Sequence, residues 1–208
     1  MEINFENELE LKILEVNRDK IYKRLNNLGA SFISKADLQS YYFDYSNGKL
    51  RENGMAIRIR KLSGEFSSQG FKKLYIKTEI SLKKKLLGDD PKNYFEMTND
   101  LEGDCINELI KKLPSGFRET DAEYKYRESY VLQGARFEIE DIYYTKILGY
   151  KNIPTFVEVQ SVAEDITRNA VALLGYEHNK FPVVNWSGRK LIQYYANKKD
   201  EVKLEEVR

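Results

Sequence analysis

The chain has 208 residues, of which 41% are apolar and 32% are charged, a composition typical of a folded soluble domain. Lys and Arg number 34 against 33 Asp and Glu, and this near-balance argues against nucleic-acid binding through bulk positive charge. A single cysteine, Cys105, excludes an intramolecular disulfide. With only one histidine, His178, a zinc site built from Cys and His is also disfavoured.

The same features predict where the protein works. No apolar run is long enough to span a bilayer, and the acidic first residues lack the basic-then-apolar order of a signal peptide. We therefore expect a cytoplasmic protein. No linker is visible, so we expect one domain over residues 1–208, with a frayed tail of about ten residues at the end.

Alternation of polar and apolar residues predicts most of the strands. A charged or polar residue at every second position is typical of a strand with one apolar face and one polar face. This pattern occurs in residues 8–13, 57–60, 75–77, 137–140 and 157–160. Aromatic and β-branched residues predict further strands at 41–43 and 127–132. Seven or eight strands are expected.

Four helices are predicted from apolar residues at helical spacing. The first follows Asn17, a typical N-cap residue, and ends at Gly29. The others are expected at about 103–113, at about 162–174, and after Ser187, where a short helix is predicted.

The charges on the polar faces are sorted by sign. Glutamates share the faces of strands 8–13 and 137–140, whereas basic residues share those of strands 57–60 and 125–127. Such faces are most often the solvent-exposed side of a sheet whose other side packs on the core. If helices cover the apolar face of a closed sheet, however, the charges converge on an interior, which needs water or a ligand of complementary charge. The basic strands would bind a polyanion, and the acidic strands would bind Mg²⁺ or Mn²⁺. A metal-bound triphosphate therefore satisfies both kinds of strand.

In their order along the chain, these segments resemble the CYTH superfamily, also called the triphosphate tunnel metalloenzymes. That family includes class IV adenylate cyclases, thiamine triphosphatases and inorganic triphosphatases. The resemblance covers about residues 6–195. It is carried by the E-x-E-x-K motif at 8–12, the second strand at 41–44, the paired arginines at 56–60, the lysine strand at 74–77, the later basic strand at 125–127, and the acidic pair at 137–141 and 156–159.

The resemblance implies an α+β fold, with a closed eight-stranded antiparallel β-barrel forming a tunnel and helices packed on its outside. It implies Mg²⁺ or Mn²⁺ as cofactor, held by Glu8, Glu10, Glu140, Asp141 and Glu158. The implied phosphate-binding residues are Lys12, Arg58, Arg60, Lys77, Lys125 and Arg127, with Lys12, Arg58 and Arg60 also assigned to catalysis.

Two departures from the family affect the charged set, and the connection from Tyr143 to Thr155 is longer than usual. Gln160 stands where many members carry a second glutamate, and residues 93–96 lack the arginine that many members place on the middle strand. We expect a triphosphatase acting on an inorganic, thiamine or nucleoside triphosphate. The alternatives are a class IV adenylate cyclase and a binding module that does not turn over its ligand. A lipocalin-like carrier would require the charged set to face outward. The expected partner is a small triphosphate, with no nucleic acid or membrane, and a homodimer remains an open alternative.

Overall fold

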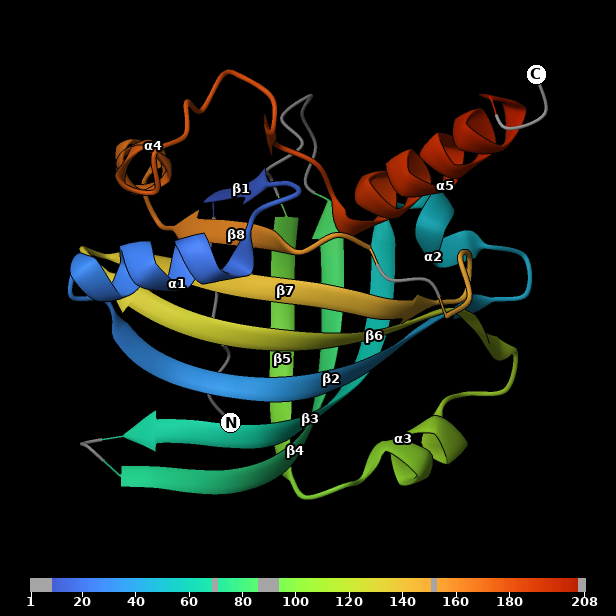
Figure 1. Ribbon diagram of the computed structural model, residues 1–208. Coiled ribbons are helices and arrows are strands. Elements are labelled where there is room, and N and C mark those ends of the chain that lie inside the picture. The colour runs from blue at the N-terminus through green and yellow to red at the C-terminus, as the bar shows by residue number, and fades with distance from the viewer. Residues whose placement is uncertain (1–8, 69–70, 86–93, 151–152, 206–208) are drawn as a thin grey trace.

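The computed structural model describes residues 9–68, 71–85, 94–150 and 153–205 (Figure 1). Its main element is one antiparallel sheet of nine strands in the order β5-β4-β3-β2-β6-β7-β8-β1-β9. The strands are β1 (Leu9–Ile13), β2 (Ser31–Tyr45), β3 (Met55–Ser68), β4 (Phe71–Lys85), β5 (Tyr94–Glu102), β6 (Phe117–Leu132), β7 (Ala135–Thr145), β8 (Phe156–Ser161) and β9 (Val183–Val184). The helices are α1 (Arg18–Asn27), α2 (Lys49–Glu52), α3 (Ile106–Lys112), α4 (Glu164–Leu173) and α5 (Gly188–Glu205).

The α+β class is confirmed, and the sheet curls into the wall of a tunnel (Figure 1). It differs in detail from the closed eight-stranded barrel that the resemblance implies. The strand order begins at β5 and ends at β9, and within the described ranges no ladder of hydrogen bonds joins those two strands. The ninth strand is only two residues long and pairs with β1. The wall is therefore curled rather than closed by hydrogen bonds.

Three helices cover the convex side of the sheet. The main core lies where α1 and α4 pack on β1, β7 and β8, and it includes Leu25, Ile139, Val157 and Val171. A smaller core forms where α3 packs near Ile59 of β3. Because residues i and i+2 share a face, the apolar positions of these strands turn their charged neighbours to the concave side.

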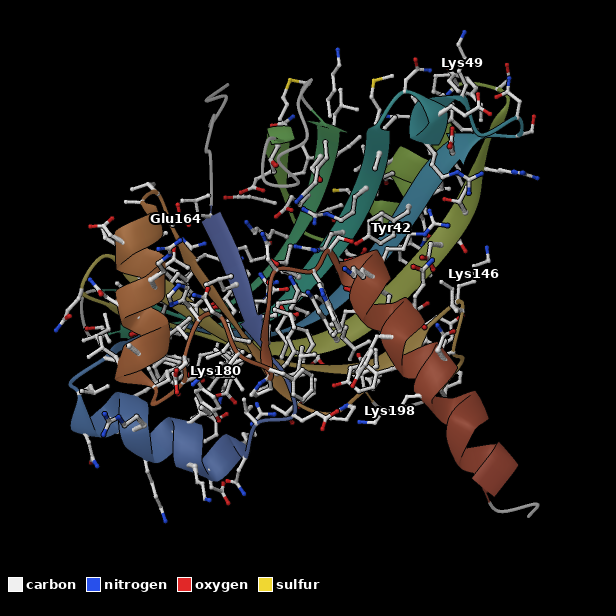
Figure 2. All side chains as sticks on the ribbon, turned by 90° about the horizontal axis from the view of Figure 1, so that it is seen from above. Tyr42, Lys49, Lys146, Glu164, Lys180 and Lys198 are labelled. Atoms are coloured by element: carbon white, nitrogen blue, oxygen red, sulfur yellow. The ribbon has the colours of Figure 1, made fainter. Side chains whose placement is uncertain are left out.

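The last helix, α5, lies against the opposite side. It packs on Ile142 and Phe156, which share their strand faces with the charged residues Glu140 and Glu158. Figure 2 shows α5 running across one end of the curved strands. The sequence predicted only a short helix after Ser187, whereas α5 continues to Glu205. One end of the concave face is thus apolar and covered.

The predicted helices and turns follow local chemistry. Asn17 caps α1, since its side-chain oxygen accepts a hydrogen bond of 3.0 Å from the backbone N–H of Lys20. The short helix α2, which the sequence did not predict, begins beside Asp44, whose carboxylate accepts the backbone N–H groups of Leu50 and Arg51. Strands β3 and β4 extend far beyond their predicted cores, to the tip of a long hairpin.

Gly64 allows β3 to approach β2 closely. It lies in β3 opposite Ala36 of β2. An added Cβ at residue 64 would lie 2.1 Å from the carbonyl oxygen of Lys35 and 2.6 Å from Cα of Ala36. Both contacts are with backbone atoms, which cannot rotate away. The close approach of the two strands at this point therefore depends on glycine.

We predict that Gly64→Ala lowers the free energy of unfolding by about 1–3 kcal/mol, the usual cost of overpacking. The measurement is urea denaturation followed by circular dichroism. Gly188→Ala is the matched control, because an added Cβ there meets nothing within 4 Å at the start of α5. Equal midpoints for the Gly64 variant and the wild type would show that the two strands can separate without cost.

Candidate active site

The concave face brings together charged residues that are far apart in the sequence. Lys12 of β1 is paired in register with Glu158 of β8, and Glu158 is paired with Glu138 of β7. On the next strand, Arg127 is paired with Glu140. In the described parts of the chain, buried or nearly buried bases and acids contact one another on this face: Lys12, Arg58, Arg60, Lys125 and Arg127, with Glu79, Glu123, Glu138, Glu140 and Glu158.

Three of these carboxylates form a cluster that could hold a divalent cation. Oxygen atoms of Glu138, Glu140 and Glu158 lie within 4.8 Å of one another, and all three residues are buried. Carboxylate oxygens are the ligands that hard cations such as Mg²⁺ and Mn²⁺ prefer. The donor set therefore fits such an ion, without indicating which one. A buried cluster of this kind also needs compensating charge, because like charges in a confined space repel.

Cations compensate the cluster from two sides. A guanidinium nitrogen of Arg127 lies 2.7 Å from Glu138, and its Nε donates to Glu140 at 2.5 Å. Lys125 donates to Glu140 at 2.7 Å, and Lys12 lies 3.0 Å from Glu158. Each carboxylate is thus neutralised by a buried base.

The pKa values of two neighbouring carboxyl groups, Glu140 and Glu158, are shifted in opposite directions by their surroundings. Burial raises the pKa of Glu140 above its usual value, although Arg127 opposes the shift. Burial also acts to raise the pKa of Glu158, but the positive charges of Lys12 and Lys125 outweigh it and hold that pKa well below the usual range. Two adjacent acids with separated affinities for protons are common in active sites.

A second charged group lies on β3 and β4. Arg58 donates to Glu79 at 2.9 Å, while a nitrogen of Arg60 lies 3.9 Å from the same carboxylate. Arg60 also donates through Nε to the hydroxyl of Ser40 at 2.9 Å. Burial disfavours the ionised form of Glu79, but Arg60 and Arg58 outweigh it and lower the pKa of this carboxyl. Burial and the neighbouring Arg58 lower the pKa of Arg60.

These contacts correct the expectation that the strands are sorted by sign. Glu79 lies two residues after Lys77 on β4, and Glu123 lies two residues before Lys125 on β6, 3.6 Å from its amine. Lys12 likewise forms an ion pair with Glu10 on β1. Acids and bases therefore alternate within single strands. Mixing is physically required, because a buried wall of one sign would carry uncompensated charge.

The expected metal ligands need one correction. Asp141 lies on the convex side, where it pairs with Arg18 and accepts a hydrogen bond of 2.5 Å from the hydroxyl of Thr155. It follows Glu140 directly in the strand, so the two side chains point to opposite faces. Glu138, two residues before Glu140, takes its place in the cluster.

The other expected residues are distributed as follows. Glu8 lies outside the described residues. Glu10 is on the concave face beside Lys12, with 37% of its side chain exposed. Lys77 is also on that face and is partly exposed, 2.9 Å from Asp100 and 3.8 Å from Glu79.

Several site residues were absent from the predicted set. Extending the alternation of 75–77 by two positions would have found Glu79, and extending that of 125–127 backwards would have found Glu123. Gln160 lies beside the acidic cluster, with its amide nitrogen 3.4 Å from Glu158 and 3.5 Å from Glu138. Near Arg58, the buried Ser81 hydroxyl has no hydrogen-bond partner among the residues described.

Comparisons with known proteins identify the family of this chain. The chain belongs to the CYTH domain family, whose sequence model matches residues 6–173. A protein of Methanocaldococcus jannaschii named "Putative adenylate cyclase" is 25% identical over 160 residues, which cover 76% of this chain and 79% of that protein.

Solved structures share the fold. The PH1819 protein of Pyrococcus horikoshii has a TM-score of 0.61 at 20% identity, covering 90% of this chain and 99% of that chain. A Hippeastrum protein described as having a dominant triphosphatase activity has a TM-score of 0.55 at 15% identity, covering 93% of this chain and 96% of that chain. In the parts of this chain that the structure describes, no helix is long and apolar enough to cross a membrane.

We predict a pH-dependent stability contribution from Glu79. Its folded-state pKa is lowered, so its ionised form stabilises the fold above its unfolded pKa of about 4.5. That stabilisation is lost as the pH falls below this value towards the folded pKa. Glu79→Gln should therefore unfold in less urea than the wild type at pH 7, and the difference should shrink below about pH 4.5.

Glu119→Gln is the control for this measurement, because Glu119 is paired in register with Phe43 and is half-exposed on the convex side. It should change the urea midpoint little at either pH. The urea midpoints of Glu79→Gln and the wild type could instead differ by the same amount at pH 7 and at acidic pH. That result would contradict the assigned ion pairs.

Proposed function

We propose that this protein is a metal-dependent phosphoryl-transfer enzyme that binds a triphosphate on the concave face and hydrolyses it. The observation that carries the proposal is the contact of Arg127 with the carboxylates of Glu138 and Glu140. A site for a polyanion and a site for a divalent cation are thus directly adjacent. Family membership supports the same class of substrate.

Charge balance favours joint binding of the two ligands. The bases and acids named above are engaged in ion pairs with one another, so either ligand alone would leave some of them without a partner of opposite sign. A divalent cation held by Glu138, Glu140 and Glu158 would neutralise the acids that now engage the bases. Arg127, Lys125 and Lys12 would then be available for phosphate oxygens. The structure therefore favours a complex of the metal with the triphosphate over either component.

The chain's own residues would act by orientation and charge neutralisation. The guanidinium groups of Arg58 and Arg60 lie two residues apart on one strand and can donate to neighbouring phosphate oxygens. Lys12 of β1 and Lys125 of β6 would provide point charges on the same concave face. A bound Mg²⁺ or Mn²⁺ would supply the Lewis acidity that neutralises charge on the transferred group. Burial of the set strengthens each of these interactions.

Cyclisation of ATP is the second candidate. It is supported by the name of the Methanocaldococcus jannaschii relative, whereas the dominant activity described for the Hippeastrum protein supports hydrolysis. The two reactions use the same charged groups and differ in the nucleophile. Water attacks the terminal phosphorus in hydrolysis, and the ribose 3′-hydroxyl attacks the α-phosphorus in cyclisation.

One assay panel distinguishes these outcomes. Tripolyphosphate, thiamine triphosphate and ATP are each incubated with Mg²⁺ or Mn²⁺, and phosphate, pyrophosphate and cyclic AMP are measured together. We expect phosphate release that requires metal and stops on chelation. Cyclic AMP with pyrophosphate would establish the cyclase instead. Binding without any product would leave only the non-catalytic module.

We predict that Glu158→Gln lowers kcat by at least about a hundredfold, since it removes one charge from the proposed metal site. Glu119→Gln, on the convex side, should retain wild-type turnover. Equal activity of the two variants, with both folded, would remove Glu158 from the catalytic machinery.

A further inference from the structure

A cavity of about 440 Å³ opens on the concave face between β2, β3, β4, β6 and β7. Its volume falls within the range typical of small-molecule sites. One part of its lining is charged and includes Arg127 and Glu138, which belong to the acidic cluster and its compensating bases. Another part is formed by the long β3–β4 hairpin. The cavity thus leads away from the proposed metal site.

The charged part has an excess of positive charge. Five cationic side chains line it, namely Arg60, Lys73, Lys77, Arg127 and Arg136, against the two carboxylates Glu79 and Glu138. Five minus two leaves three positive charges in excess. This differs from the acidic cluster, where each carboxylate contacts a base. A triphosphate chain carries charge of the opposite sign.

The hairpin part is aromatic and apolar. Phe66 and Tyr75 lie on the concave face of β3 and β4, with ring centroids 6.4 Å apart and ring planes at 89°. Leu62 and Ile33 continue this wall. Phe66 is 42% exposed although it lines a cavity, so much of its surface is available for contact. Phosphate oxygens gain nothing from such a surface, whereas a flat organic ring would bury it.

We propose that Phe66 and Tyr75 bind the aromatic ring of an organic triphosphate, and that this chain prefers such an ester to inorganic tripolyphosphate. The inference rests on the proposed function for the phosphate part of the ligand. Its own basis is the juxtaposition of an aromatic wall and a cationic wall in one cavity. The cations bind the phosphates, and the rings of the hairpin bind the flat group at the other end.

Binding constants test this proposal independently of turnover. Titration calorimetry with Ca²⁺ in place of Mg²⁺ compares ATP, thiamine triphosphate and tripolyphosphate on the wild type and on Phe66→Ala. We expect the variant to bind at least one organic triphosphate about tenfold more weakly, within the range for loss of one ring-stacking contact. Tripolyphosphate binding should change by less than about twofold. Comparing the binding constants of ATP and thiamine triphosphate shows which of their rings binds at this site.

Two further variants keep the result interpretable. Phe66→Leu retains an apolar side chain if the alanine variant unfolds, and it should weaken the same ligand in the same direction. Leu74→Ala lies on the same hairpin but on the convex side, where Leu74 is 81% exposed, and should leave all three affinities unchanged. Equal loss for tripolyphosphate, or unchanged affinity for both organic ligands, would overturn the ring site. Phe66→Ala could weaken only the organic triphosphates while the wild type turns over no triphosphate at all. That combination would support the ring site and overturn the proposed enzymatic function.

Discussion

The buried pairing of acids with bases on the concave face is the constraint on which the rest of the structure depends. Burying a charge is costly unless a partner of opposite sign lies within contact distance, and removing one partner commonly costs 3–5 kcal/mol. Arg127 meets this condition for two carboxylates at once. Because the charged set occupies the concave face, the apolar positions of the same strands must be buried elsewhere. The convex core beneath α1 and α4 follows from this requirement.

The same pairing determines how ligands can enter. A set of bases already neutralised by internal acids is not an open anion site. These bases can bind a polyanion readily only when another positive charge neutralises the acids. A divalent cation bound by Glu138, Glu140 and Glu158 would do so. Under the proposed function, metal and triphosphate would therefore be thermodynamically coupled, each improving the affinity for the other. Such coupling would allow the charged residues to stabilise the folded protein and still bind a ligand.

The two ends of the concave face differ in chemistry. At one end α5 packs on Ile142 and Phe156 and covers an apolar surface. Away from this helix, the β3–β4 hairpin presents Phe66 and Tyr75 in a cavity that also contains cations. Gly64, in the same hairpin, allows β3 to approach β2 closely. The cavity beside it has a cationic part and an aromatic part, which is the basis for the organic triphosphate proposed above.

The sequence by itself determined the face on which each charge lies, because strand geometry repeats every two residues. Arg58, Arg60 and Lys125 were placed on this basis, whereas Lys12 came from the family resemblance. The same rule excludes Asp141, which directly follows Glu140. Only the tertiary structure decided which charges are partners. The pairing of Glu79 with Arg58 and the meeting of Glu138 with Glu158 depend on register between strands, which alternation within one strand cannot specify. The nine-stranded curled wall likewise arises from long-range pairing, including the short contact between β1 and β9.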